Sequence, residues 1–335
     1  MEGAIIIKSF FKIPLIILGV ISALILFILG FAGNYFYNLA LNPDASKSLV
    51  FGEPSEEDSS HPDSDQVSQE QTSGATTKES QSWFHEKSNF EDVYLTSSDN
   101  LKLHSYKITN PTPSHTWVIS VHGYMSQGNV LSNPAKHFYD MGYNVLLPDL
   151  RGHGLSEGDY IGMGWDDRND VIGWIDYILE QDPTAQIVLH GISMGAATVM
   201  SVSGEALPSN VKAVIEDCGY TSVWDQFASQ LKGLFNLPEF PFMHAASLVT
   251  KIRAGYWLSE ASPIAQVAKS KTPTLFIHGD QDNFVPYSMH QELYDASSAE
   301  KEILTIEGAG HAMAATHNAD LYWSTISTFL GKYLD

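Results

Sequence analysis

A serine between two glycines is the first stretch of the chain whose residue types and spacing suit chemistry. Gly191-x-Ser193-x-Gly195 follows the apolar residues 187–189 and precedes small residues that can begin a helix. This pattern is typical of a nucleophile elbow, a sharp turn between a strand and a helix that exposes the serine hydroxyl. A side chain at either glycine would crowd the neighbouring strand or helix. Because a serine hydroxyl needs a base to attack a carbonyl, the pattern predicts acyl transfer only together with partners elsewhere in the chain.

Partners of the right type follow downstream. His311 ends the sequence Gly308-Ala309-Gly310-His311, in which the glycines permit close approach of the backbone, and it is the candidate base. Asp280 and Asp282 both come just after a predicted buried strand. Either carboxylate is suited to hold an imidazole in one tautomer and to stabilise its cation. Spacing alone leaves the choice between the two aspartates open.

The elements that must position these residues alternate between strands and helices. Residues 93–95 and 101–106 flank a turn, which predicts an antiparallel hairpin. Apolar residues at helical spacing between 171 and 178 predict an amphipathic helix that leads into the elbow strand. Further strands are predicted at residues 117–121, 143–147, 211–215, 274–277 and 303–306. Strands separated by helices imply an α/β fold, with a mostly parallel sheet covered by helices on both faces.

The order of these motifs resembles that of the α/β-hydrolase family over roughly residues 90–333. The matching pieces are His122-Gly123-Tyr124, Asp149-x-Arg151-Gly152-His153-Gly154-x-Ser156, Gly191-x-Ser193-x-Gly195, His278-Gly279-Asp280-Gln281-Asp282-x-x-Val285-Pro286 and Gly308-Ala309-Gly310-His311. Jointly they are specific. The chain looks like the bacterial membrane-anchored branch labelled serine aminopeptidase-like or lysophospholipase-like hydrolases, a label that implies fold and catalytic triad better than substrate.

The resemblance implies a catalytic role for three residues. The family's chain order of serine, acid and histidine corresponds to Ser193, Asp282 and His311. The family pattern Gly-x-x-Asp-x-x-Val-Pro selects Asp282, which leaves Asp280 as a turn residue and the minority choice for the acid. In this mechanism Ser193 attacks, His311 carries the proton and Asp282 orients His311. No metal or organic cofactor is implied.

The resemblance also implies an oxyanion hole and a cap. The backbone N–H groups of Met194, directly after the serine, and of Tyr124, after the strand at 117–121, are expected to bind the oxyanion. The insertion at residues 219–268 resembles the family's cap. Its many aromatic and aliphatic residues favour a substrate with an apolar acyl or aryl group. His122 and the turn at residues 151–154 are expected to shape loops.

The N-terminal segment predicts a membrane anchor. Residues 13–31 form an almost uninterrupted apolar run, long enough to cross a bilayer core, and the anchor is taken to span residues 13–33. Lys8 and Lys12 precede the run and acidic residues follow it, so we expect residues 1–12 in the cytoplasm and the catalytic domain outside, on a single-pass protein of the cell membrane. The alternative is a signal peptide cleaved near Asn34.

The composition of the remaining chain separates a linker from a globular domain. Residues 34–83 are rich in Ser, Thr, Gln, Glu, Asp and Pro for most of their length, which predicts a disordered acidic tether. The hydrolase domain is then expected to span residues 84–335. The net charge of −21 argues against a nucleic-acid partner, because binding to phosphates needs clustered Lys and Arg. The single cysteine, Cys218, rules out an internal disulfide and is expected to be a small buried residue.

The sequence therefore favours a membrane-tethered serine hydrolase that acts on carboxylic esters, with a small-molecule ester carrying an apolar group as substrate. The first alternative is a peptidase of the aminopeptidase type, acting on short peptides. It would need an acidic cap residue for the substrate amine, for which Glu239 and Glu260 are available. The alternative from another class is a binding protein that keeps the hydrolase fold without catalysis.

Overall fold

The computed structural model describes residues 2–51 and 77–334, and within them an eight-stranded sheet forms the centre of the protein. The order of the strands is β1-β2-β4-β3-β5-β6-β7-β8. Their bounds are β1 Glu91–Thr96, β2 Lys102–Ile108, β3 Thr116–Val121, β4 Asn144–Pro148, β5 Gln186–Ile192, β6 Val211–Asp217, β7 Thr274–Gly279 and β8 Lys301–Ile306.

The first two strands form the antiparallel hairpin that the sequence predicts. β1 pairs with β2, and β2 pairs antiparallel with β4, whereas every pair from β4 through β3 to β8 is parallel. Parallel neighbours need crossover connections, and helices supply them. The mostly parallel sheet of an α/β-hydrolase fold is thereby confirmed.

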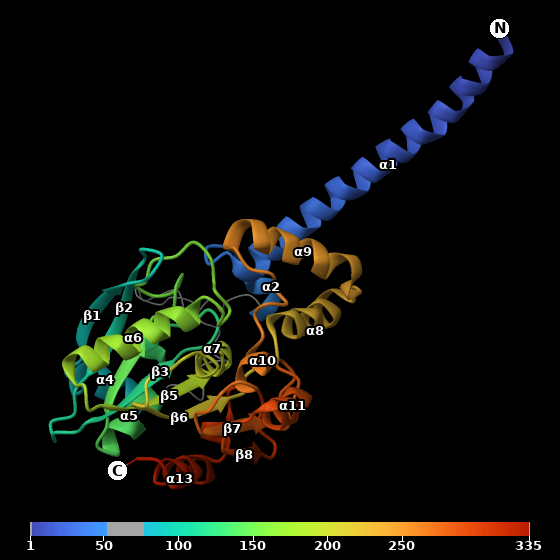
Figure 1. Ribbon diagram of the computed structural model, residues 1–335. Helices are drawn as coiled ribbons and strands as arrows, with labels where there is room; N and C mark the ends of the chain where they lie inside the picture. The colour runs from blue at the N-terminus through green and yellow to red at the C-terminus, as the bar shows by residue number, and fades with distance from the viewer. Residues whose placement is uncertain (1, 52–76, 335) are drawn as a thin grey trace.

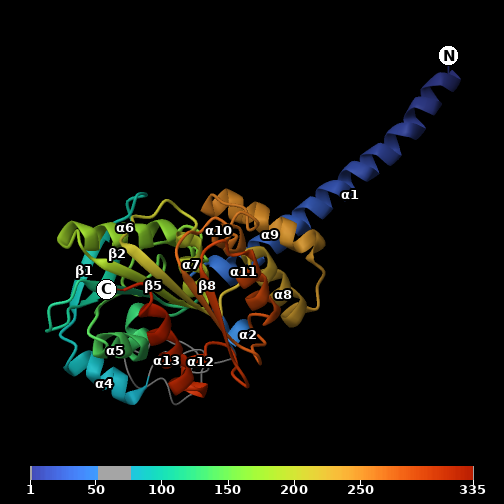
Figure 2. The same cartoon turned by 60° about the horizontal axis from the view of Figure 1, so that its bottom comes forward.

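Helices cover both faces of the sheet (Figures 1 and 2). Side chains alternate along a strand, so Trp117 and Ile119 of β3 pack in one core and Val118 packs in the other. The first face carries α6 Asp167–Gln181, α7 Met194–Ser203, α10 Pro263–Val267 and α11 Ser288–Ala296. The second face carries α4 Lys78–Glu86, α5 Ser132–Asp140, α12 Ala314–His317 and α13 Ala319–Leu330, with the 3₁₀ helix η2 Gly128–Leu131 preceding α5.

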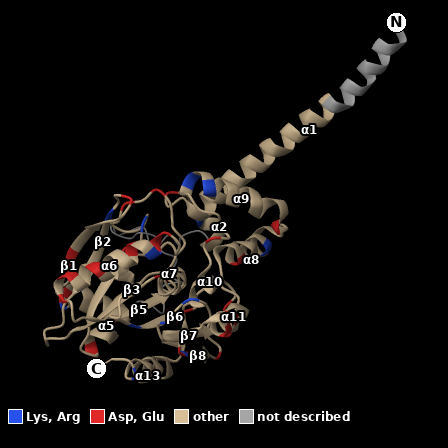
Figure 3. Ribbon diagram, viewed as in Figure 1, with Lys and Arg blue, Asp and Glu red and all other residues tan. Residues whose placement is uncertain are grey.

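Helix α1, Glu2–Leu41, projects away from the domain at its N-terminal end (Figure 1). Its stretch Ile16–Leu41 is long and apolar enough to cross a membrane. It contains no charged residue, and Figure 3 shows the described part of the helix without blue or red. Phe27 and Phe31 are both more than 70% exposed in the protein. An apolar helix whose side chains are exposed in the protein is a candidate membrane anchor or signal sequence.

The structure differs from the prediction of a tether that begins at residue 34. Helix α1 continues to Leu41, and Tyr37 and Leu41 are buried. Gly33 lies so close to α9 that a Cβ built on it would stand 2.6 Å from the carbonyl oxygen of Ala245. These residues are therefore ordered against the domain by tertiary packing. Residues 52–76 of the predicted tether lie outside the described residues.

The structure also differs at the predicted start of the domain. Helix α4 begins at Lys78, where Thr77 and Ser80 form a capping box. Trp83 and Phe84 are buried, and Ser80 shares a hydrogen bond with Ser132 of α5. The few apolar residues of α4 are enough to dock it, so the folded domain includes residues that the polar composition assigned to the tether.

A roof of helices lies above the carboxyl ends of the central strands. We use this name for α8 Val223–Phe235, α9 Glu239–Ala254 and residues 33–41 of α1. The first two belong to the predicted cap insertion, whereas the third comes from the N-terminal helix. Helix α10, the last part of the insertion, packs against α7 and Val267 joins the core below. The roof thus combines segments far apart in the sequence.

Candidate active site

Ser193 stands at the turn between β5 and α7 with φ of +58°. This conformation is strained for a residue other than glycine, and it persists only where the surroundings enforce it. A Cβ built on Gly191 would lie 2.2 Å from the carbonyl oxygen of Gly195, and one on Gly195 would lie 2.0 Å from that of Val121. Both glycines are therefore required by close backbone contacts, as the sequence analysis expects.

Two short hydrogen bonds connect Ser193, His311 and Asp282. Ser193 Oγ lies 2.8 Å from His311 Nε2, and His311 Nδ1 lies 2.7 Å from Asp282 Oδ2. These distances fit a hydroxyl that donates to Nε2 while Nδ1–H donates to the carboxylate. The structure thus brings together three residues from the ends of β5, β7 and β8, which are neighbours or near neighbours in the sheet. Such a geometry is suited to nucleophilic attack assisted by a general base.

The loop after β7 holds the Asp282 carboxylate in place. Oδ1 accepts hydrogen bonds from the backbone N–H groups of Phe284 and Val285, each at 2.9 Å. His278 Nε2 lies 3.1 Å from Oδ2. Burial alone would raise the pKa of Asp282, but the hydrogen bonds from His278 and His311 outweigh it and lower the pKa below its usual range. Asp282 is therefore a fixed anion under His311.

Asp280 has a different environment. Its Oδ1 accepts a hydrogen bond from the backbone N–H of Gly308 at 2.7 Å. This contact ties the loop after β7 to the loop that precedes His311. The structure brings Asp282, and not Asp280, to the imidazole, and Asp280 has the turn-capping contact expected for it.

Tyr124 and Met194 line the same cavity as Ser193. Met194 is the first residue of α7, so its N–H belongs to the helix turn that lacks intrahelical acceptors. Gly123 approaches Ser193 closely, because a Cβ built on it would lie 3.5 Å from Ser193 Cβ. Tyr124 follows directly, and it lines the same cavity as Ser193 and Met194. The two residues predicted to supply the oxyanion donors therefore both lie at the cavity that contains the serine.

Two buried histidines shape the loop before Tyr124. His122 Nδ1 lies 2.7 Å from the Gly123 carbonyl oxygen, and its Nε2 accepts from the backbone N–H of Leu150. His153 Nε2 accepts from the backbone N–H of Met125. Burial lowers the pKa of His122, and it lowers that of His153 to about 3, so both rings are neutral. Their contacts agree with the expected structural roles.

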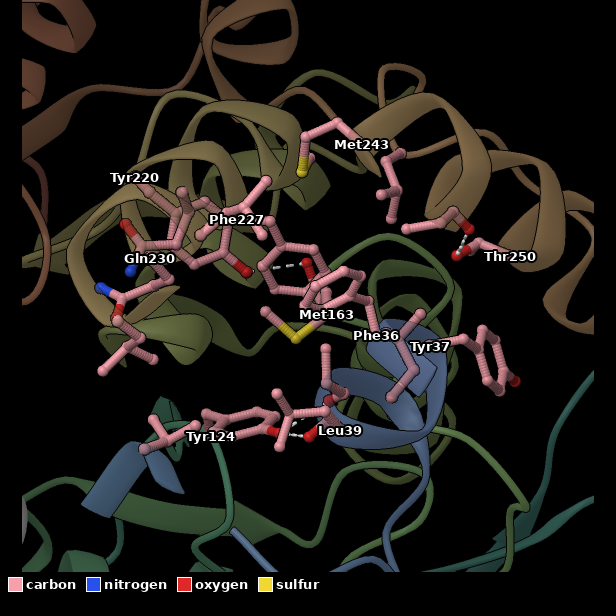
Figure 4. Close-up of a pocket in the computed structure, with 18 of the residues that line it drawn as sticks. Phe36, Tyr37, Leu39, Tyr124, Met163, Tyr220, Phe227, Gln230, Met243 and Thr250 are labelled. Atoms are coloured by element: carbon pink, nitrogen blue, oxygen red, sulfur yellow. Dashed lines mark hydrogen bonds between the residues drawn. The ribbon is translucent and has the colours of Figure 1, made fainter. Parts of the chain in front are cut away.

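A cavity opens above Ser193 beneath the roof (Figure 4). Its empty volume is about 910 Å³, including the opening. The wall is mostly apolar, and among the described residues no Asp, Glu, Lys, Arg or His lines it. The polar exceptions are Ser193, Gln226, Gln230, Thr250 and the tyrosines at positions 37, 124 and 220. A pocket of this kind favours an apolar substrate group.

Neither acidic residue named for a peptidase reaches this cavity. Glu239 is exposed and accepts a hydrogen bond from Trp224 Nε1 at 3.2 Å. Glu260 is also exposed, accepts from the backbone N–H of Trp257 and lies 3.6 Å from Lys251 Nζ. Both carboxylates are used at the surface of the protein.

One group of side chains in the described part of the chain has the spacing of a metal site. Cys218 Sγ lies within 4.8 Å of ligand atoms of Asp282 and His311. Burial raises the pKa of the Cys218 thiol well above its usual range, which keeps it protonated, whereas a metal would need the thiolate. His311 also directs its two nitrogens to Ser193 and Asp282. The group is therefore better suited to hydrogen bonding than to metal binding, and Cys218 is buried as expected.

Two contributions to the site were not predicted from the sequence: the contact of His278 with Asp282, and the part of the cavity wall that comes from α1. His278 supports Asp282 from below, and its place four residues before the aspartate at the end of a strand is the signal that was available. Five residues of α1 line the cavity, and their composition gives no sign of this; they are Phe36, Tyr37, Leu39, Ala40 and Leu41. Gln226 and Gln230 add a further link, since both donate to the Phe284 carbonyl oxygen from α8.

Comparison with known protein families agrees with the observed α/β-hydrolase fold. The family model described as serine aminopeptidase, S33, matches residues 112–247 and 250–316, which include all three hydrogen-bonded residues. The chain belongs to this family. Its fold is that of the α/β-hydrolases, and the family members are hydrolases.

Individual relatives are more distant. The uncharacterized protein YqkD of Bacillus subtilis is 32% identical over 199 residues, which cover 59% of this chain and 65% of that protein, slightly less than two thirds of its length. An esterase of Pyrococcus furiosus has a similar structure, with a TM-score of 0.62 and 23% identity over 78% of this chain and 96% of its own. Est1E of Butyrivibrio proteoclasticus, solved with ferulic acid bound, gives a TM-score of 0.57 and 19% identity over 72% of this chain and 99% of its own. At these identities the two structures show similarity of fold.

Proposed function

We propose that this hydrolase cleaves carboxylic esters through an acyl-enzyme formed on Ser193. The observation that supports it most is the hydrogen-bonded series from Asp282 through His311 to Ser193 at the base of an apolar cavity. In the first step His311 accepts the Ser193 proton as Oγ bonds to the ester carbonyl carbon, and the protonated His311 then gives that proton to the leaving alcohol. In the second step His311 takes a proton from a water molecule as that water bonds to the acyl carbon. The protonated His311 then returns the proton to Ser193 Oγ as the acyl–Oγ bond breaks, which releases the acid and restores the free serine.

The backbone N–H groups of Met194 and Tyr124 stabilise the tetrahedral oxyanion in this proposal. Such donors are worth about 2.7 to 4 kcal/mol each in related acyl transfer. Because they are main-chain groups, their position depends on the turn around Gly123 and on the start of α7. The neutral side chains of His122 and His153 support that turn from below.

The apolar cavity favours an ester over an aminoacyl peptide. A free substrate amine would need an acidic partner, and Glu239 and Glu260 have surface contacts instead. Esterases among the structurally similar proteins support the same choice.

The catalytic domain is proposed to lie outside the cytoplasm on a single-pass membrane anchor, with Lys8 and Lys12 on the cytoplasmic side.

The test compares esters and amides on the full-length protein in detergent. We expect turnover of aryl esters with apolar acyl groups, together with labelling of Ser193 by a fluorophosphonate. Faster turnover of aminoacyl anilides than of any ester would instead support the peptidase. Absence of both labelling and turnover in folded protein would support a binding protein without catalysis.

A further inference from the structure

The wall of the cavity above Ser193 includes the end of the N-terminal helix. Phe36, Leu39, Ala40 and Leu41 line the same cavity as Ser193 and Met194. Figure 4 shows Phe36 and Leu39 on α1 beside the pocket, with Phe227 and Met243 of the cap helices opposite. The segment expected to act only as an anchor and tether therefore reaches the space where an acyl chain would lie.

Polar contacts fix this segment to the hydrolase body. The Tyr124 hydroxyl donates a hydrogen bond to the Ala40 carbonyl oxygen at 2.6 Å. The backbone N–H of Ile161 donates to the Leu41 carbonyl oxygen at 2.8 Å. The buried Lys47 donates to the carbonyl oxygens of Leu39 at 2.7 Å and Asn42 at 2.8 Å. These carbonyls lie at the end of α1 and lack intrahelical partners, so the contacts hold the last turn of the helix in one position.

The cap helices hold the same segment from the other side. The Phe36 ring meets those of Phe235 and Phe242 edge to face, with centroids 5.4 Å and 6.2 Å away. Arg253 donates to the side-chain oxygens of Asn34 and Asn38. Phe36 is thus held between the cavity and the two cap helices, at a place where the size of its side chain changes the space available.

We propose that residues 36–41 of α1 form one wall of the acyl pocket and that Phe36 sets the length of acyl chain accepted. This inference rests on the proposed esterase function. The pocket is complete only when α1 is attached, so the helix both tethers the domain and takes part in substrate selection. In an apolar pocket, one or two methylene groups change discrimination by about 10 to 200-fold.

The test measures kcat/KM for aryl esters with acyl chains of four, eight and twelve carbons on the full-length protein in detergent. We expect Phe36→Ala to raise the ratio of long-chain to short-chain kcat/KM about tenfold or more, and Phe36→Trp to lower it. Opposite shifts cannot arise from a general loss of folding. Phe31→Ala is the matched control, since Phe31 lies on the same helix, is 71% exposed and does not line the cavity.

A binding measurement separates this inference from the proposed reaction. Ser193→Ala protein is titrated with fatty acids of the same three lengths, with and without Phe36→Ala. If Phe36→Ala shifts the binding preference towards longer fatty acids but the wild-type protein does not turn over esters, the esterase function is contradicted and the role of α1 as a pocket wall is supported. If both Phe36 variants turn over esters with unchanged chain-length ratios, the proposal that α1 forms a wall of the acyl pocket is contradicted, whereas the proposed esterase function is not.

Discussion

The carboxyl edge of the sheet and the roof above it meet at Ser193 but are built differently. The edge uses short polar contacts and a strained backbone, as in the 2.7 Å pair of His311 and Asp282. The roof uses apolar contacts between helices, including the rings around Phe36. Polar geometry at the edge suits one reaction, whereas apolar packing in the roof is tolerant of shape. Changes at the edge should therefore slow all substrates alike, and changes in the roof should alter which substrate is preferred.

The largest effect at the edge is expected from Ser193→Ala. Without the nucleophile, kcat should fall by around 10⁶ for every ester, judged from the loss of a triad member in a serine protease. Steady-state turnover of the short-chain and long-chain esters measures this directly. Activity close to that of the wild-type protein would show that Ser193 is not the nucleophile.

Asp282→Asn is expected to lower kcat by about 10⁴ at neutral pH, because an amide favours the wrong tautomer of His311. Asp280→Asn is the matched control and should change kcat little, since its hydrogen bond goes to Gly308. Both variants should leave the ratio between long-chain and short-chain esters unchanged. The reverse order of the two effects would assign the acid to Asp280.

Two glycine substitutions compare the packing of edge and roof. Gly195→Ala places a methyl group against the Val121 carbonyl oxygen and should lower the free energy of unfolding by about 1 to 3 kcal/mol or more. Gly233→Ala lies in α8, where a Cβ would meet nothing within 4 Å, and should raise it by about 0.5 to 1 kcal/mol. Denaturant titration of both proteins provides the measurement. If the two alanine substitutions changed the free energy of unfolding equally, position 195 at the edge would be no more tightly packed than position 233 in the roof.

The smallest effect on turnover is expected from Glu216→Gln, beneath the edge at the end of β6. Burial raises the pKa of Glu216 from 4.5 to about 8, against the opposing charge of His278. The unfolded chain loses this proton first, so the contribution of Glu216 to stability falls as pH rises from about 4.5 to about 8. The variant should be less sensitive to pH in this window and keep the same substrate ranking. Thermal unfolding at several pH values tests it, and identical pH slopes would contradict it.

Much of the edge follows from local sequence. The two elbow positions require glycine because a Cβ built on either residue would lie only 2.2 or 2.0 Å from a backbone carbonyl oxygen, and such a requirement leaves a recognisable pattern in the sequence. Alternation of strands and helices predicts the parallel sheet, which then places the ends of β5, β7 and β8 together. The catalytic roles of Ser193, Asp282 and His311 stay predictions until the variants are measured.

The sequence by itself determined the fold class, the apolar N-terminal helix and the residues available for acyl transfer. Spacing alone leaves the choice between Asp280 and Asp282 open, and the family resemblance selects Asp282. The tertiary structure shows the physical difference, because the Asp282 carboxylate lies at His311 Nδ1 whereas the Asp280 carboxylate accepts from the backbone N–H of Gly308. Tertiary structure also decided that one part of α1 has exposed side chains whereas another part lines the cavity. An apolar side chain has the same composition whether it faces lipid or protein, so the exposed Phe31 and the cavity-lining Phe36 differ only through contacts with α8 and α9, which lie about 200 residues away in the chain.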